Sequence, residues 1–267
     1  MDTALATLLT SLAVTAHLDG RLGPDDLTHT FLEADLPVPL VLDDPVFGTD
    51  APTGLLLAVP ALRRAGVRRL RLALVHPTLP LRVPRVDREA RRAISRSSAV
   101  AVAEVGAEGA SGVEGTSGAG DGGESVAVVV LDGEANLRIF PCARVRYATV
   151  DTVSVAESAR TLREAVMAAL SLVETHGQAV PEGIRNLQWR DWQADMSAEK
   201  ARGELSTLLD DPAHAILLQT ALDVHQAFSG VLAPASLQPP ELGAALDRVH
   251  KAAAGVITAV SREHGVG

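Results

Sequence analysis

The strongest constraint on the fold is a change in hydrophobic period near residue 150. Before this point, short apolar or alternating runs typical of strands follow two N-terminal helical patterns; after it, apolar residues recur every three or four positions, as in helices. Strands followed by helices favour an α+β fold. We expect a mixed subdomain with a mostly antiparallel sheet and helices over residues 1–150 and a helical subdomain over residues 151–267, with one continuous domain as the alternative.

The N-terminal part of the chain contains several element signals. Helices are predicted over residues 3–17, from Pro24 onward, and over residues 86–97, where the pattern is amphipathic. The run Val67–His76 alternates between Leu70, Leu72 and Leu74 on one side and Arg69, Arg71 and Ala73 on the other. This pattern predicts a strand whose leucine face is buried and whose other face is exposed to solvent. Strand-like runs occur at Val38–Leu42, Leu55–Val59, Val67–His76, Ala99–Val105, Val126–Leu131 and Leu137–Phe140.

Between two of these strands, residues 106–124 are rich in Gly, Ser, Ala and acidic residues. Such a segment buries too little apolar surface to order itself, so we expect a flexible loop. Its end formally matches G-x-G-x-x-G, but Val126–Leu131 reads as a strand where a dinucleotide site needs a helix. Neither lysine of the chain follows a glycine, so a Walker A loop is excluded in its usual form. No cofactor is expected.

The last third of the chain shows helical spacing throughout. Apolar residues recur at helical intervals, and Asp and Pro residues stand where a helix begins. Four helices are predicted: Ala156–His176, Ser197–Leu209, Ala213–Phe228 and Glu241–Glu263.

Charge is distributed unevenly along the 267 residues. The formal net charge of −9 divides into −8 for residues 1–60, +9 for residues 61–100 and −10 for the remainder. In the predicted helix, Arg88, Arg92 and Arg96 share one side, and Arg69 and Arg71 share one face of the preceding strand. Together they form a candidate anion or nucleic-acid footprint. The alternatives are a solvated basic face, or pairing with the acidic N-terminal segment, and the acidic chain without interleaved aromatics makes nucleic acid the less favoured partner.

Both tryptophans of the chain, Trp189 and Trp192, lie within one connection between predicted helices, separated by Arg190 and an aspartate. Trp and Arg are favoured residues at interface hot spots. Alternatively, the indoles cap a helical core with their N–H groups reaching water. These three residues are candidate binding residues.

No catalytic or metal-binding set is apparent. The eight histidines are scattered, and on one helix His214 and His225 would stand about 16 Å apart, too far to share a metal. We expect ordinary surface or helix-end histidines. Cys142, the only cysteine, excludes an intramolecular disulfide and is expected to be buried and inert.

Four segments of the chain follow one another in a definite order: Leu36–Pro39, Asp43–Pro45 at a looser spacing, Gln188–Arg190, and Leu246–Arg248 followed by alanines. This order resembles that of a family of actinobacterial proteins of similar length and no assigned activity. In that family a Leu-Pro-Val-Pro-Gly-Asp-Pro…Leu-Pro-Gly stretch precedes a strand pair, a Trp-containing segment and Ala/Leu-rich C-terminal helices. The Gly-rich insertion and the second Trp depart from the pattern. The resemblance implies no site residue.

The leading hypothesis is a non-enzymatic, soluble cytoplasmic protein that acts through contact with another protein or with itself, as a homodimer. No run is long and apolar enough for a membrane helix, so no membrane partner is expected. The alternatives are a small-ligand protein or enzyme with a pocket between sheet and helices, and an anion or nucleic-acid binder using residues 63–96.

Overall fold

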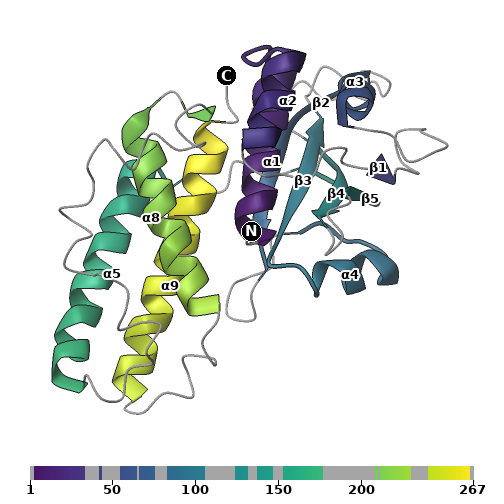
Figure 1. Cartoon of the computed structure of the whole chain (residues 1–267). Helices are drawn as coiled ribbons and strands as arrows, with labels where there is room; N and C mark the ends of the chain where they lie inside the picture. The colour runs from purple at the N-terminus through teal and green to yellow at the C-terminus, as the bar shows by residue number, and fades with distance from the viewer. Residues whose placement is uncertain are drawn as a thin grey trace. The chain divides into compact units, whose positions relative to one another are not determined.

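The computed structural model describes the chain in several stretches. These are residues 3–33, 42–43, 55–64, 66–75, 83–105, 124–131, 137–146, 153–176, 208–209, 211–229 and 240–264. The chain divides into two compact units: Met1–Val75, Leu81–Thr152 and His264–Gly267 form the first, and His76–Pro80 and Val153–Glu263 form the second. An antiparallel sheet with N-terminal helices, followed by packed C-terminal helices, confirms the predicted α+β class (Figure 1).

The first unit is built on a five-stranded sheet with the order β1-β5-β4-β3-β2. Strands β2 to β5 are antiparallel, and the short β1 pairs parallel with β5. β3 coincides with its predicted bounds, whereas β5 continues well beyond the predicted end at Phe140. The strands are β1 Leu42–Asp43, β2 Val67–Leu74, β3 Ala99–Val105, β4 Glu124–Leu131 and β5 Leu137–Arg146.

The described residues of this unit form four helices, of which α1 lies along the sheet (Figure 1). α1 contacts β2, β3 and β4, and the hydroxyl oxygen of Thr15 accepts a hydrogen bond from the backbone N–H of Leu70 at 3.0 Å. All side chains from Ala6 to Ala16 are buried, although the sequence pattern indicated only one apolar face. The helices are α1 Thr3–Leu18, α2 Pro24–Glu33, α3 Leu55–Arg64 and α4 Arg88–Ile94.

The prediction of a strand over Leu55–Val59 is wrong, because these residues begin helix α3. Such a short apolar run does not distinguish a strand from a helix. Along the whole of α3, Leu55, Val59 and Leu62 recur at helical spacing, and Val59 and Leu62 are buried. The helical spacing over ten residues therefore decides the structure of this short apolar run.

Helix α4 covers part of the sheet face opposite α1. Its Ala90 and Ile94 are buried in an apolar cluster with residues of β2 to β5: Ala73, Val100, Val102, Val128, Val130 and Phe140. The predicted exposed face of β2 is therefore wrong at Ala73, which is 4% exposed. Although β2 is an edge strand, its Ala73 packs in the cluster that Ala90 and Ile94 of α4 cover, so both faces of the strand are buried at this point.

The second unit is described as three helices, α5 Val155–His176, α8 Pro212–Ser229 and α9 Pro240–Glu263, whose bounds nearly coincide with the predicted ones. α9 packs against both α5 and α8. α5 buries one row, from Val155 through Leu162 to Ala169, whereas α9 is buried along most of its length. An Ala-rich helix suits this position because small side chains allow two neighbours to approach.

Some predictions lie outside the described residues. These are the flexible loop over residues 106–123, the helix Ser197–Leu209 apart from its last two residues, and the strand Val38–Leu42 apart from Leu42. Among the described helices, none combines the length and the apolar character that crossing a membrane requires.

Candidate functional site

The candidate site is the exposed side of α4, which we call the arginine face and define as Arg88, Arg92 and Arg96. All three side chains are exposed. In the described part of the chain none of the three forms an ion pair, and their side chains make no hydrogen bond. The neighbouring Arg91 is also exposed, and its Nη2 donates a 3.4 Å hydrogen bond to the carbonyl oxygen of Val86.

The local sequence explains why these arginines point outward. Ala90 and Ile94 are the buried residues of α4, and at helical spacing their burial directs Arg88 and Arg92 toward solvent. Asp87 fixes the start of the helix, since its Oδ1 accepts a hydrogen bond from the backbone N–H of Ala90 at 2.7 Å. Arg96 lies in the turn after the helix, where its N–H bonds to the carbonyl oxygen of Ala93.

The two acidic residues in this part of the chain are already occupied. Asp87 is the N-cap, and Glu89 accepts a hydrogen bond from Nη2 of Arg138 at 3.0 Å. The guanidinium of Arg138 also lies 5.3 Å from the centroid of the Phe140 ring. In the described part of the chain, neither carboxylate therefore forms an ion pair with the arginine face.

The arginines of β2 behave differently from those of α4. Nε of Arg69 and Nε of Arg71 donate to the two carboxylate oxygens of Glu104 on β3, at 2.6 and 2.8 Å. The side chains of Arg69, Arg71 and Glu104 are 23%, 13% and 4% exposed. The prediction that Arg69 and Arg71 join the anion footprint is therefore wrong, because a buried carboxylate already holds both.

Glu104 was missed by sequence reasoning, although a signal existed. It is the only charged residue in the run Ala99–Val105, and in the sheet it stands directly opposite Arg69. An acid within an otherwise apolar strand requires a cationic partner if it is buried. Glu104 of β3, which lies outside residues 1–60, therefore supplies the carboxylate that the described residues place beside Arg69 and Arg71.

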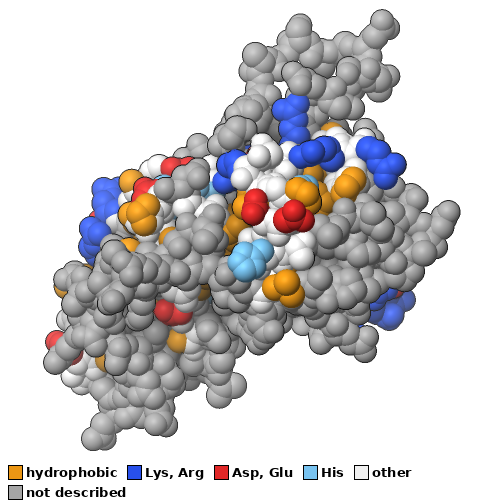
Figure 2. Space-filling model, turned by 45° about the horizontal axis from the view of Figure 1, so that its top comes forward, with side chains coloured by type: hydrophobic (Ala, Val, Ile, Leu, Met, Phe, Trp, Pro, Cys, Tyr) orange, Lys and Arg blue, Asp and Glu red, His pale blue; other side chains and the backbone are white. Residues whose placement is uncertain are grey.

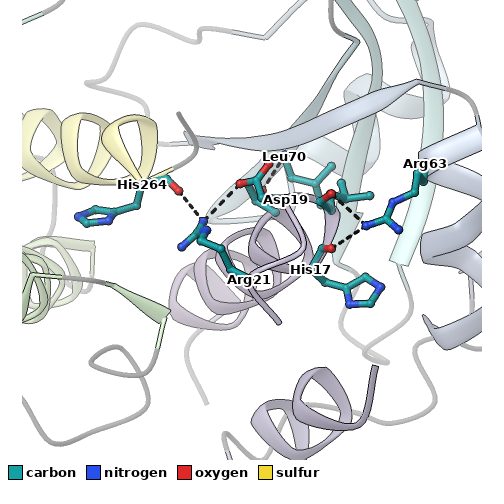
Figure 3. Close-up of polar contacts among 8 residues, drawn as sticks. His17, Asp19, Arg21, Arg63, Leu70 and His264 are labelled. Carbon is teal, nitrogen blue, oxygen red and sulfur yellow. Dashed lines mark hydrogen bonds and ion pairs between the residues drawn. The ribbon is translucent and has the colours of Figure 1, made fainter. Parts of the chain in front are cut away.

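Other arginines hold the end of α1, as Figure 3 shows. Nη2 of Arg63 donates to the carbonyl oxygens of His17 and Leu18, at 2.9 and 3.0 Å. A cation at this position satisfies orphan carbonyl groups and complements the helix dipole. Nη2 of Arg21 lies 2.9 Å from the carbonyl oxygen of His264 and 3.4 Å from Oδ2 of Asp19. In Figure 2, basic side chains lie beside acidic ones at this end of the first unit.

The predicted binding residues Trp189, Arg190 and Trp192 lie outside the described residues.

Cys142 is half-buried in β5, where it packs against the α4 cluster, and burial raises the pKa of its thiol to about 11. At neutral pH the thiol is protonated and therefore a poor nucleophile, in line with an inert cysteine.

The histidine prediction is wrong for two residues. His225 of α8 and His250 of α9 are 1% and 0% exposed, and their ring nitrogens lie 2.9 Å apart. They are core residues, not surface or helix-end histidines. The two residues stand on different helices, far apart in the sequence, so only the packing of α8 on α9 reveals the pair.

Within the described stretches, no group of three or more His, Cys, Asp or Glu side chains is placed to hold a metal ion. Comparison of the chain with protein-family models, with curated proteins and with solved structures gives no match.

Proposed function

We propose that this chain is a binding protein that contacts the phosphate backbone of a nucleic acid through the arginine face. The observation that supports it is the contrast within one basic segment. Arg69 and Arg71 are held by Glu104, and Arg63 by the end of α1, whereas Arg88, Arg92 and Arg96 are exposed and make no ion pair among the described residues.

The chemistry of the side chains indicates which part of a nucleic acid is contacted. Guanidinium groups present planar forks that match phosphate oxygens. Successive members of the arginine face follow one another at every fourth position, a rise of about 6 Å in the helical part, which allows neighbouring phosphates to be contacted. The residues between them are Ala, Ile, Ser, Arg and one Glu, and none is an aromatic that could stack on a base. We therefore propose backbone contact that is independent of base sequence.

The net charge of −9 limits how strong this contact can be. At low salt, the acidic remainder of the chain repels a polyanion over a long range, while the arginine face attracts it at short range. A contact with three phosphates gives a slope of log K against log salt of about −2.7 for duplex DNA. Weak binding that disappears at high salt is the expected behaviour.

The test is titration of a short fluorescent DNA duplex with the full chain over a series of salt concentrations. The triple variant Arg88→Gln, Arg92→Gln, Arg96→Gln is expected to lose most of the affinity and the salt dependence. A matched control removes three exposed arginines of the second unit, Arg160, Arg163 and Arg248, with the same change of net charge. Equal losses in the two variants, or wild-type binding that does not respond to salt, would contradict the proposal.

Protein–protein contact or homodimer formation through Trp189, Arg190 and Trp192 remains a second prediction. It is supported by the clustering of both tryptophans around one arginine. Light scattering of the wild type and of Trp189→Ala tests it. A strict monomer that captures no partner sensitive to Trp189→Ala would remove this candidate.

A further inference from the structure

The helical unit contains a pair of buried histidines that plays no part in the proposed function. Nε2 of His250 lies 2.9 Å from Nδ1 of His225, and the two rings are stacked with centroids 4.9 Å apart and an interplanar angle of 16°. Both residues are almost fully buried, at 0% and 1% exposure. The contact joins α8 to α9, two helices of this unit that pack against each other.

A hydrogen bond between two imidazole nitrogens has room for one proton. One nitrogen donates N–H and the other must accept with its lone pair. Two imidazoles have four nitrogen positions, so the pair with its contact intact carries at most three protons and one positive charge. If both rings were imidazolium, two N–H groups would point at each other across 2.9 Å.

We propose that the His225–His250 pair is an acid-sensitive latch between α8 and α9. The latch holds while the pair carries no charge or one charge, and it opens when the second imidazole takes up its proton. The electron pair that accepts the hydrogen bond is the one that binds this proton, so protonation and loss of the bond are the same event.

In the described parts of α5, α8 and α9, no charged side chain is buried with the pair. Asp223 is exposed and bonds to Gln219, and Asp247 bonds to Nζ of Lys251 at 2.7 Å. Of the described part of α5, α8 and α9, the other titratable side chains are exposed or half-buried: Glu157, Arg160, Arg163, Glu164, Glu174, His176, His214, Glu241, Arg248, Arg262 and Glu263. The row that α5 buries contains no titratable group.

The direction of the pH effect follows from the proton count. In the unfolded chain both histidines become protonated below a pKa of about 6.5. The closed latch excludes at least one of these protons, so its stability is complete above that pKa and declines as the pH falls below it. The equilibrium for opening rises roughly tenfold per pH unit for each excluded proton.

The experiment is amide hydrogen exchange of α8 and α9 in the full chain between pH 7.5 and pH 5.0, corrected for intrinsic exchange rates. The wild type is expected to show the roughly tenfold rise per pH unit below about pH 6. The double variant His225→Asn, His250→Gln keeps amide groups that can hydrogen-bond but do not titrate, and its opening is expected to lack this rise. His176→Gln is the matched control and keeps the wild-type slope.

Two further measurements keep the test decisive if the amide variant does not fold. The variant His225→Leu, His250→Leu removes both partners together, which leaves no polar group unpaired, and it is also expected to lack the rise. NMR titration of the wild-type rings is expected to show no more than one imidazolium while α8 and α9 stay protected. Equal pH slopes in wild type and double variants, or two imidazolium rings in a protected helix pair, would overturn the proposal.

Discussion

The arginines of β2 and those of α4 lie within one basic segment and have opposite surroundings. Arg69 and Arg71 project from a strand beside β3, and Glu104 on that strand accepts hydrogen bonds from both. Arg88 and Arg92 project from a helix whose other side is buried, where the two nearest acids are occupied by a cap and by Arg138. The first group is part of the sheet, and the second remains available to a partner.

This difference shows that pairing depends on the neighbouring element more than on the number of charges. Residues 61–100 carry a net charge of +9, and residues 1–60 carry −8. Yet, among the described residues, the carboxylate that pairs with Arg69 and Arg71 is that of Glu104, which lies outside residues 1–60. Cross-strand geometry brings one well-placed carboxylate closer than an excess of acids elsewhere in the chain.

The largest expected effect comes from removing the carboxylate charge of Glu104. Glu104→Gln leaves Arg69 and Arg71 largely buried without their anionic partner, and breaking such a buried group costs about 3–5 kcal/mol. Chemical denaturation measures the loss of unfolding free energy. Glu89→Gln is the control, since its pair with Arg138 is exposed and its expected cost is within about 0.5 kcal/mol. Similar losses of unfolding free energy in the two variants would show that the ion pairs of Glu104 with Arg69 and Arg71 stabilise the fold no more than the exposed pair of Glu89 with Arg138.

A smaller effect separates single arginines of the two groups. Arg71→Gln removes one of two cations from Glu104 and is expected to cost about 1–3 kcal/mol, with little change in DNA binding. Arg92→Gln is expected to leave the unfolding free energy within about 0.5 kcal/mol of the wild type and to weaken DNA binding. Chemical denaturation of both variants measures the change in unfolding free energy, and titration of the DNA duplex measures the change in affinity. If Arg71→Gln lost DNA binding but kept its unfolding free energy, Arg71 would belong to the binding surface and not to the structural group around Glu104.

The sequence predicted the elements that are long or clearly apolar. The bounds of α9 nearly coincide with the prediction because apolar residues keep helical spacing along its 24 residues, and those of β3 coincide with it because Ala99–Val105 is one apolar run that only Glu104 interrupts. Leu55–Val59 failed because so short an apolar run fits either period. The all-round burial of α1 also exceeds its pattern, since buried Thr and Ser residues do not register as apolar.

The candidate site was only half predictable, for a physical reason. The outward side of α4 is a property of one helix, so Arg88 and Arg92 could be placed on it from spacing alone. The roles of Glu104 and His250 depend on contacts with residues 33 or more and 25 positions away, respectively. The local sequence marks Glu104 as an acid within an apolar run, but it does not identify the residues that pair with Glu104, and it does not indicate that His250 contacts His225.

The smallest effect concerns the cap that orients the arginine face. Asp87→Ala removes the acceptor of the 2.7 Å hydrogen bond from the backbone N–H of Ala90, and loss of an N-cap costs about 1 kcal/mol. Because α4 has only seven residues, its first turn is a large part of the helix. Duplex affinity is therefore expected to fall severalfold in Asp87→Ala, although removing an acid should by charge alone increase it. Asp87→Ser restores a capping oxygen without the carboxylate and is expected to bind the duplex at least as tightly as the wild type. Tighter binding by Asp87→Ala would mean that net charge, not the orientation of α4, determines the affinity of the arginine face.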